Sequence, residues 1–224
     1  MTENSNQLEA QVKAFALSFL SLLERRVASI TRQPWAEVSR EIEDCAQTIV
    51  AVNAFQIVDA PSQSHLLLSS FLLAAYRVLS PLIADKKFLR ESLFDALYGE
   101  AKKNVAAYLA ERFGIAPDAP EKAFEKVAAN FKKIGDRKFG RAFIYEQETL
   151  NEKEAVTIVR RCFFNDFFRA NNGLEVLPLL CAGDELWMEE LSQPKYRVKA
   201  FRTALLSKGD DVCRFHFVRA NLRE

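Results

Sequence analysis

The chain has 224 residues, 49% of them hydrophobic, which is enough for one large core or two small ones. Its 31 lysines and arginines nearly cancel 30 aspartates and glutamates, a balance that argues against nucleic-acid binding by phosphate neutralisation. The polar start MTENSNQLEA is unlike a signal peptide, and no apolar run reaches the roughly 20 residues that cross a bilayer. Four cysteines without a secretory signal indicate reduced thiols. We therefore expect a cytoplasmic protein with no nucleic-acid or membrane partner.

Apolar residues recur at helical spacing through the first half of the chain. They predict helices over residues 7–26, 34–52, 64–83, 87–113 and 121–134. Pro61 is expected to break the chain before the third helix, and Gly114 to end the fourth. We assign residues 1–60 to an N-terminal helical hairpin extension. Its apolar stripe from Leu8 to Leu23 can serve as a homodimer contact.

After Gly135 the sequence becomes rich in β-branched and aromatic residues. Two hairpins with two helices between them are predicted: strands over 142–148 and 155–164, helices over 165–170 and 174–191, and strands over 196–206 and 212–219. The predicted fold class is α+β, in which N-terminal helices precede a β-β-α-α-β-β unit with an antiparallel sheet of about four strands. Residues 61–224 form this predicted α+β domain.

Four residues in the C-terminal third carry the concentrated chemical signal: Cys162, Cys181, Asp184 and Cys213. Cys181 and Asp184 stand three residues apart on a predicted helix, so they share a face that we expect to point inward. A buried carboxylate costs several kcal/mol unless it is hydrogen-bonded, paired with a cation or bound to a metal. Asp184 therefore needs a partner.

Three interpretations of these residues are open. The thiols can be small core hydrophobes, with Asp184 paired to a nearby arginine. One thiol can be a nucleophile with a lowered pKa. Alternatively, Cys162, Cys181 and Cys213 can be ligands of a zinc ion, although the usual CxxC spacing is absent. A conventional triad is disfavoured because strand alternation places His216 on the face opposite Cys213.

Four ordered segments between about Leu66 and Phe217 carry a family resemblance. They are LLLSSFLLAAYRVL with DKKFLRESLFDAL, then VRRCFFNDFF, LPLLCAGDELW and LLSKGDDVCRFHF. In this order they resemble the L-2-amino-thiazoline-4-carboxylic acid hydrolase family. The β-β-α-α-β-β order is also, more loosely, similar to 4-vinyl-reductase-type domains, which bind ligands in an internal apolar pocket.

The resemblance implies a hydrolase that acts on a carbon–nitrogen or carbon–sulfur bond of a small ring. Its substrate would be a cyclic amidine- or thiazoline-like, or amide-like, carboxylate. By the resemblance, Cys162 or Cys181 supplies a thiolate or a metal ligand, and Asp184 orients or deprotonates the attacking water. Cys213 is then a second ligand or a wall of the site.

The substrate-binding residues implied with this centre are Arg161, Arg202, Phe163 and Trp187. One of the arginines would hold the substrate carboxylate with two hydrogen bonds. A cofactor is left open, with zinc as the candidate. The alternative function is a non-catalytic regulatory domain that binds a small ligand, haem or a metal.

Overall fold

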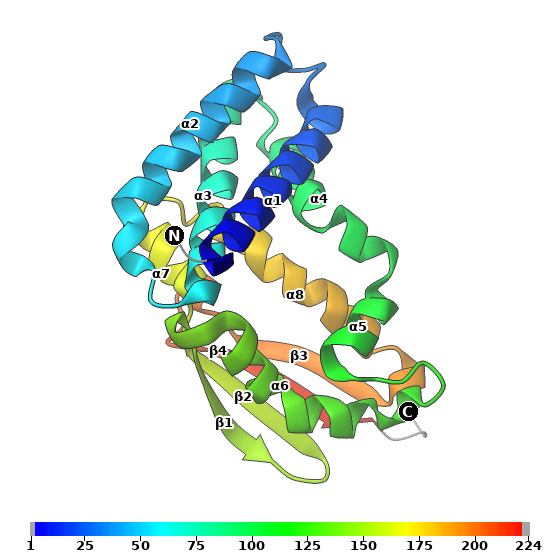
Figure 1. Cartoon of the computed structure of the whole chain (residues 1–224). Helices are drawn as coiled ribbons and strands as arrows, with labels where there is room; N and C mark the ends of the chain where they lie inside the picture. Colours follow the sequence, from blue (N-terminus) through cyan, green and yellow to red (C-terminus); the bar gives the residue numbers. More distant parts are fainter. Residues whose placement is uncertain (1–2, 221–224) are drawn as a thin grey trace. The chain divides into compact units, whose positions relative to one another are not determined.

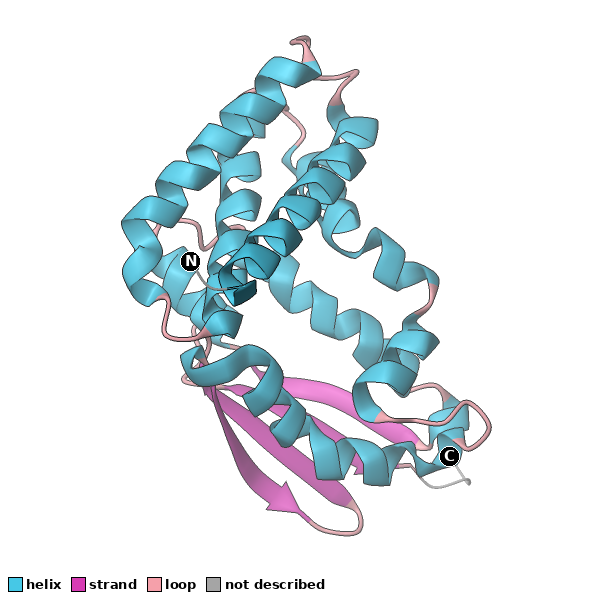
Figure 2. Cartoon of the chain, viewed as in Figure 1, coloured by secondary structure: helices cyan, strands magenta, loops and turns pink. Residues whose placement is uncertain are grey.

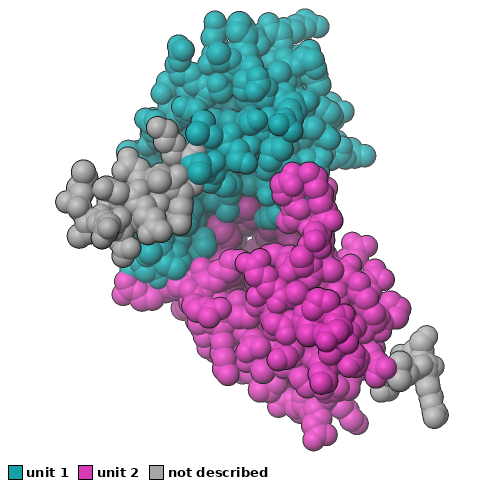
Figure 3. All heavy atoms as spheres, turned by 45° about the vertical axis from the view of Figure 1, so that its right-hand side comes forward, with its two compact units in different colours: residues 1–99 teal, residues 100–224 magenta. Residues whose placement is uncertain are grey.

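The computed structural model describes the backbone of residues 3–220 and the side chains of residues 14–220. The α+β prediction is confirmed, since helices fill the first half of the chain and an antiparallel four-stranded sheet lies in the second (Figure 2). The chain divides into two compact units, Met1–Gly99 and Glu100–Glu224 (Figure 3). The predicted domain boundary after residue 60 stays a prediction.

Unit 1 is helical throughout its described residues. It contains α1 (Glu3–Val27), α2 (Trp35–Asn53), the short 3-10 helix η1 (Ala54–Gln56), α3 (Ala60–Leu79) and most of α4 (Lys86–Lys103). Helices α2 and α3 lie side by side, and α1 also contacts α3 (Figure 1). Within the described part of the chain, no helix is both long enough and apolar enough to cross a membrane.

Part of the apolar stripe of α1 is buried against the rest of unit 1. Phe19 and Leu23 are almost fully buried there, at 1% and 0% exposure. The side chain of Leu8, where the predicted dimer stripe begins, lies outside the described residues. The homodimer contact therefore stays a prediction.

A capping box begins α3 earlier than the sequence predicts. Asp59 Oδ1 accepts a hydrogen bond from the Ser62 N–H at 2.9 Å, and Ser62 Oγ accepts one from the Asp59 N–H at 2.9 Å. Pro61 lies in the first turn, where a missing N–H leaves no helical bond unmade. The expectation that Pro61 breaks the chain is therefore wrong, and the helix begins at Ala60.

The predicted helix over residues 87–113 is two helices, α4 and α5 (Val105–Phe113). Asn104 separates them as the N-cap of α5, because its Oδ1 accepts a hydrogen bond from the Ala107 N–H at 3.0 Å. The prediction of one helix is wrong because an asparagine in the sequence is a weaker sign of a helix end than a proline or a glycine. Gly114, in the left-handed conformation at φ 68°, ends α5 as predicted.

Unit 2 contains α5, the sheet and three further helices. The further α-helices are α6 (Ala123–Phe139), α7 (Phe163–Ala170) and α8 (Leu177–Leu191). The strands are β1 (Ile144–Leu150), β2 (Glu154–Arg161), β3 (Val198–Ala204) and β4 (Cys213–Arg219). All neighbouring strands are antiparallel, in the order β1-β2-β4-β3. Helix α6 contacts β1, β2 and β4, whereas α8 contacts β3 (Figure 1).

Strand β4 divides its side chains between the two faces of the sheet. The rings of Phe215 and Phe217 lie 5.1 and 4.9 Å from the ring of Phe131 on α6, so this face packs against helices. On the other face His216 stacks on Phe201 at 4.8 Å. Alternation places Cys213 on the helix-covered face, as the sequence predicts.

Candidate functional site

Asp184 lies on α8 and is held by donors from two elements. Trp187 Nε1, one turn further along α8, donates to Asp184 Oδ1 at 3.0 Å. Arg202 Nη1, from β3, donates to Asp184 Oδ2 at 3.4 Å. The Asp184 side chain is 33% exposed, so the carboxylate is fixed in orientation while water still reaches it.

The surroundings of Asp184 make its carboxyl a weaker acid than a surface aspartate. Burial raises the pKa of the Asp184 carboxyl above its usual value, and the charge of Glu185 adds to the rise. The guanidinium groups of Arg202 and Arg112 and the Trp187 hydrogen bond oppose that rise without cancelling it. A carboxyl shifted in this way exchanges protons nearer to neutral pH than a surface aspartate does.

Arg202 is buried, with 5% of its side chain exposed, and both of its terminal nitrogens donate to groups of the protein. Besides Asp184, its Nη2 donates to the Cys181 carbonyl oxygen and to Glu185 Oε1, both at 3.1 Å. The guanidinium also lies 5.6 Å from the ring centre of Phe215. Holding a substrate carboxylate with Arg202 would require some of these contacts to break, so its geometry suits positioning of Asp184.

Two of the predicted thiols meet the same short segment after β3. Cys181 Sγ donates to Ser207 Oγ at 3.4 Å, and Cys213 Sγ accepts a hydrogen bond from the Leu206 N–H at 3.3 Å. Burial raises the pKa of both thiols, to about 11 for Cys213. Both are therefore protonated near neutral pH.

Cys162 lies just outside the strand predicted for it. Strand β2 ends at Arg161, and Cys162 is the N-cap residue of α7. Burial raises the pKa of the Cys162 thiol strongly, and the charges of Cys213 and Cys181 would raise it further. None of the three thiols has the lowered pKa expected of a nucleophilic cysteine.

A metal centre needs three or more ligands around one point. Among the described residues, no three His, Cys, Asp or Glu side chains are grouped so that they could hold a metal ion. Zinc binding by Cys162, Cys181 and Cys213 stays a prediction.

The remaining predicted residues fall into different environments. Trp187 is 2% exposed and Phe163 3%, and the Phe163 ring stacks on Phe167 at 6.0 Å. Arg161 has 55% of its side chain exposed and pairs with Asp166 at 3.1 Å. The structure therefore joins Asp184, Trp187, Arg202 and Cys181 through direct contacts, and leaves Arg161 and Phe163 beside Cys162.

Two side chains near the centre were not predicted from the sequence. Burial raises the pKa of Tyr145 well above its usual value, and the charges of Asp184 and Cys162 add to this. The guanidinium of Arg112, on helix α5, lies 5.5 Å from the ring centre of Trp187 on α8. The four-residue spacing of Tyr108 and Arg112 on one helix face predicts only their contact with each other.

A family model described as L-2-amino-thiazoline-4-carboxylic acid hydrolase matches residues 70–217. Among curated proteins, none matches the chain. The crystal structure of the Fe(II) unliganded H-NOX protein from K. algicida is similar at 10% identity over 94% of this chain and 97% of that one, with a TM-score of 0.39. A single-residue mutant of that protein gives 10% identity, 93% and 96% coverage and a TM-score of 0.38. Likenesses at this level do not indicate a function.

Proposed function

Because the chain belongs to the L-2-amino-thiazoline-4-carboxylic acid hydrolase family, we propose that it hydrolyses a small cyclic amidine- or thiazoline-like, or amide-like, carboxylate at a centre built around Asp184. The observation that carries the proposal is the environment of this carboxyl. It is partly exposed, fixed by Trp187 and Arg202, and has a pKa raised by burial. These are the properties of a general acid–base group.

For a 2-amino-thiazoline-4-carboxylate the reaction is the addition of one water molecule. The water oxygen bonds to the ring carbon between nitrogen and sulfur, and its proton passes to the Asp184 carboxylate. The remaining hydroxyl proton moves to the ring nitrogen as the carbonyl forms and the carbon–sulfur bond breaks, and the first proton returns from Asp184 to the leaving sulfur. The product is an N-carbamoyl cysteine with a free thiol, so atoms and charge balance.

In this mechanism water is the nucleophile and the thiols stay neutral. The raised pKa values of Cys181 and Cys213 support that assignment, since a thiol with a pKa of about 11 is almost fully protonated at pH 7. The thiol of Cys181 would form part of the wall beside the reacting sulfur. Arg202 and Trp187 act on Asp184 as positioning residues.

The substrate carboxylate needs a cation other than Arg202. Of the two predicted arginines, Arg161 is the accessible one, and its pair with Asp166 is an exposed ion pair of the kind that contributes little stability. Arg161 is therefore the candidate for the clamp, a role that stays a prediction because its ion pair is with Asp166, beside Cys162. Arg161→Gln should then raise KM for the substrate with little change in kcat.

The test uses L-2-amino-thiazoline-4-carboxylate as the substrate. The thiol product is separated from the protein by ultrafiltration and quantified, so that the chain's own cysteines do not contribute. We expect Asp184→Asn to lower kcat by at least about a hundredfold, the range typical for loss of a general acid–base group. Glu189→Gln, an exposed position on the same helix, is the matched control and should keep full activity.

Wild-type turnover with an equally active Asp184→Asn variant would contradict the acid–base assignment. If the wild type itself releases no thiol from this compound, release of an amine or ammonia from amide-like carboxylates tests the broader substrate class. A visible chromophore in the purified protein would favour the alternative of a ligand- or haem-binding regulatory domain.

A further inference from the structure

A second polar site lies in unit 2, between α5 and α6. It is a surface pocket of about 300 Å³. Its lining residues come from these two helices: Tyr108, Glu111, Arg112, Ile134, Arg137 and Lys138. Three of the six are cations and one is an anion, so the pocket has a positive balance.

Arg112 is the innermost cation of this pocket. Its guanidinium lies 5.3 to 5.9 Å from the ring centres of Tyr108, Phe113, Phe139 and Trp187. One of its terminal nitrogens donates to the Tyr108 hydroxyl. Its Nε atom is buried and has no hydrogen-bond partner among the described residues. A buried, unpaired guanidinium donor is costly, and an anion held beside this guanidinium would offset that cost through its charge.

Lys138 faces the same space from α6. Its Nζ lies 5.8 Å from the ring centre of Tyr108, over the ring that Arg112 also contacts. Burial lowers the pKa of Lys138, the charge of Arg112 lowers it further, and Glu111 opposes the change. Two cations that disfavour each other across one pocket are stabilised together when an anion lies between them.

We propose that this pocket binds the anionic group, a carboxylate or a phosphate, of a small molecule between Arg112, Arg137 and Lys138. Charge-assisted hydrogen bonds from a guanidinium and an ammonium are the contacts that hold such groups most strongly. Tyr108 and Ile134 provide an aromatic and an apolar wall for the rest of the molecule. The volume of about 300 Å³ is at the lower end of small-molecule sites.

The pocket does not depend on the proposed hydrolysis, but one side chain connects the two sites. Trp187 is in contact with Arg112 on one side, and its indole N–H donates to Asp184 on the other. The chain has only two tryptophans, Trp35 and Trp187. In a Trp35→Phe protein the emission therefore comes from Trp187, and the Asp184→Asn variant separates a response of the pocket from a response of the Asp184 centre.

The experiment titrates inorganic phosphate and, separately, succinate into the Trp35→Phe protein, with sodium chloride at matched ionic strength as the blank. We expect a saturable change in Trp187 emission with a Kd below about 1 mM for at least one of the two probes. A rise in melting temperature at the same concentrations is the second measurement. The tighter probe tells whether the natural ligand is a phosphate or a carboxylate.

Exposed cations of α6 supply both the test variants and the control. Arg137→Gln and Lys138→Gln should each weaken binding at least about tenfold, because each removes a charged hydrogen bond. Lys133→Gln, exposed on the same helix but outside the pocket, should bind as tightly as the parent. The Asp184→Asn variant should also retain binding, which separates this site from the hydrolytic centre.

Two results would overturn the proposal. One is the absence of saturable binding of either probe up to about 10 mM, well above the range of specific affinity. The other is equal binding by the Arg137→Gln, Lys138→Gln and Lys133→Gln proteins, which would indicate a general charge effect.

Discussion

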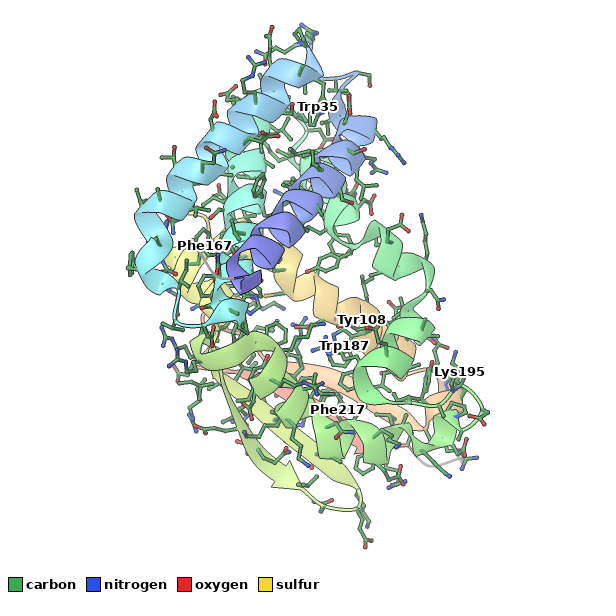
Figure 4. All side chains as sticks on the ribbon, viewed as in Figure 1. Trp35, Tyr108, Phe167, Trp187, Lys195 and Phe217 are labelled. Atoms are coloured by element: carbon green, nitrogen blue, oxygen red, sulfur yellow. The ribbon has the colours of Figure 1, made fainter. Side chains whose placement is uncertain are left out.

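Unit 1 and unit 2 fill their interiors with different side chains. The fully buried positions of unit 1 are mostly branched aliphatic residues, among them Ile42, Leu66 and Leu72, each at 0% exposure. Unit 2 is organised around rings, among them those of Trp187 and Phe217 (Figure 4). The ring centre of Phe131 of α6 lies 5.8 Å from that of Trp187 and 4.9 Å from that of Phe217. One core is aliphatic and the other aromatic.

The difference bears on where charged groups can be held. Aliphatic side chains offer a buried charge no favourable contact, whereas the face of an aromatic ring attracts a cation. In unit 2 the guanidinium groups of Arg112 and Arg202 lie over Trp187 and Phe215, and Trp187 also donates to Asp184. The aromatic core thus holds both the candidate acid–base centre and the pocket beside it, because rings keep the cations close to the carboxylate.

The largest expected effect comes from removing one ring from this core. Phe217 is 0% exposed and contacts both Phe131 and Trp187. Phe217→Ala should reduce the free energy of unfolding by about 3–5 kcal/mol, measured by urea denaturation. Leu72→Ala, at an equally buried position of unit 1, should also destabilise, by about 2–5 kcal/mol, but without altering Trp187 emission in the folded protein.

If Phe217→Ala costs less than about 1 kcal/mol, the rings are loosely packed. The difference between an aliphatic and an aromatic core would then make no difference to the free energy of unfolding.

Two helical glycines, one in each unit, give the next largest contrast. A Cβ on Gly135 of α6 would lie 2.8 Å from ring carbons of Tyr145, whereas a Cβ on Gly99 of α4 would meet nothing within 4 Å. We expect Gly99→Ala to stabilise by about 0.5–1 kcal/mol through helix propensity. Gly135→Ala should destabilise by about 1–3 kcal/mol, since Tyr145 is held by neighbouring rings and cannot move freely.

Thermal unfolding of the two glycine variants measures this contrast directly. Opposite shifts in melting temperature are expected, upward for Gly99→Ala and downward for Gly135→Ala. Stabilisation by both would mean that the Tyr145 ring has room to shift, so the aromatic core is less rigid than its contacts indicate.

Local signals in the sequence were enough to predict much of this fold. Alternation in β4 predicts that Cys213 shares the helix-covered face with Phe215 and Phe217, and the ring contacts of Phe215 and Phe217 agree. The three-residue spacing of Cys181 and Asp184 predicts that both lie on one face, and Arg202 contacts both residues. The end of β2 before Cys162 was missed, because aromatic residues suit a strand and a helix start equally well.

The rest of the site depends on contacts that no short stretch of sequence contains. Arg112 joins the centre only because α5 and α8 pack together, which brings its guanidinium over Trp187. Arg202 was predicted as a substrate clamp from the sequence alone. Its burial and its three internal acceptors arise from the pairing of β3 with β4 and from packing on α8, and neither can be read from a short stretch of sequence. The sequence identifies the chemical groups, and the tertiary packing decides which of them remain available.

The smallest expected effect concerns how the surroundings of Asp184 shift the pKa of its carboxyl. If the Asp184 carboxylate is the base, kcat/KM should fall at acidic pH as that group becomes protonated. Because burial raises the Asp184 pKa, this acid limb should lie above the ordinary value of 3.8. Arg202 opposes that rise, so Arg202→Gln should move the limb to still higher pH, with less than about a tenfold loss of kcat/KM at a given pH on the limb.

A pH profile separates this electrostatic effect from a general loss of structure. With Arg202→Gln the profiles of variant and wild type should converge at alkaline pH, where Asp184 is ionised in both. Lys199→Gln removes an exposed cation from the same strand and should leave the limb in place. A uniform loss of kcat/KM at every pH in Arg202→Gln would instead indicate that Arg202 fixes the orientation of Asp184 without tuning its charge, since a change in pKa alone cannot lower the alkaline plateau.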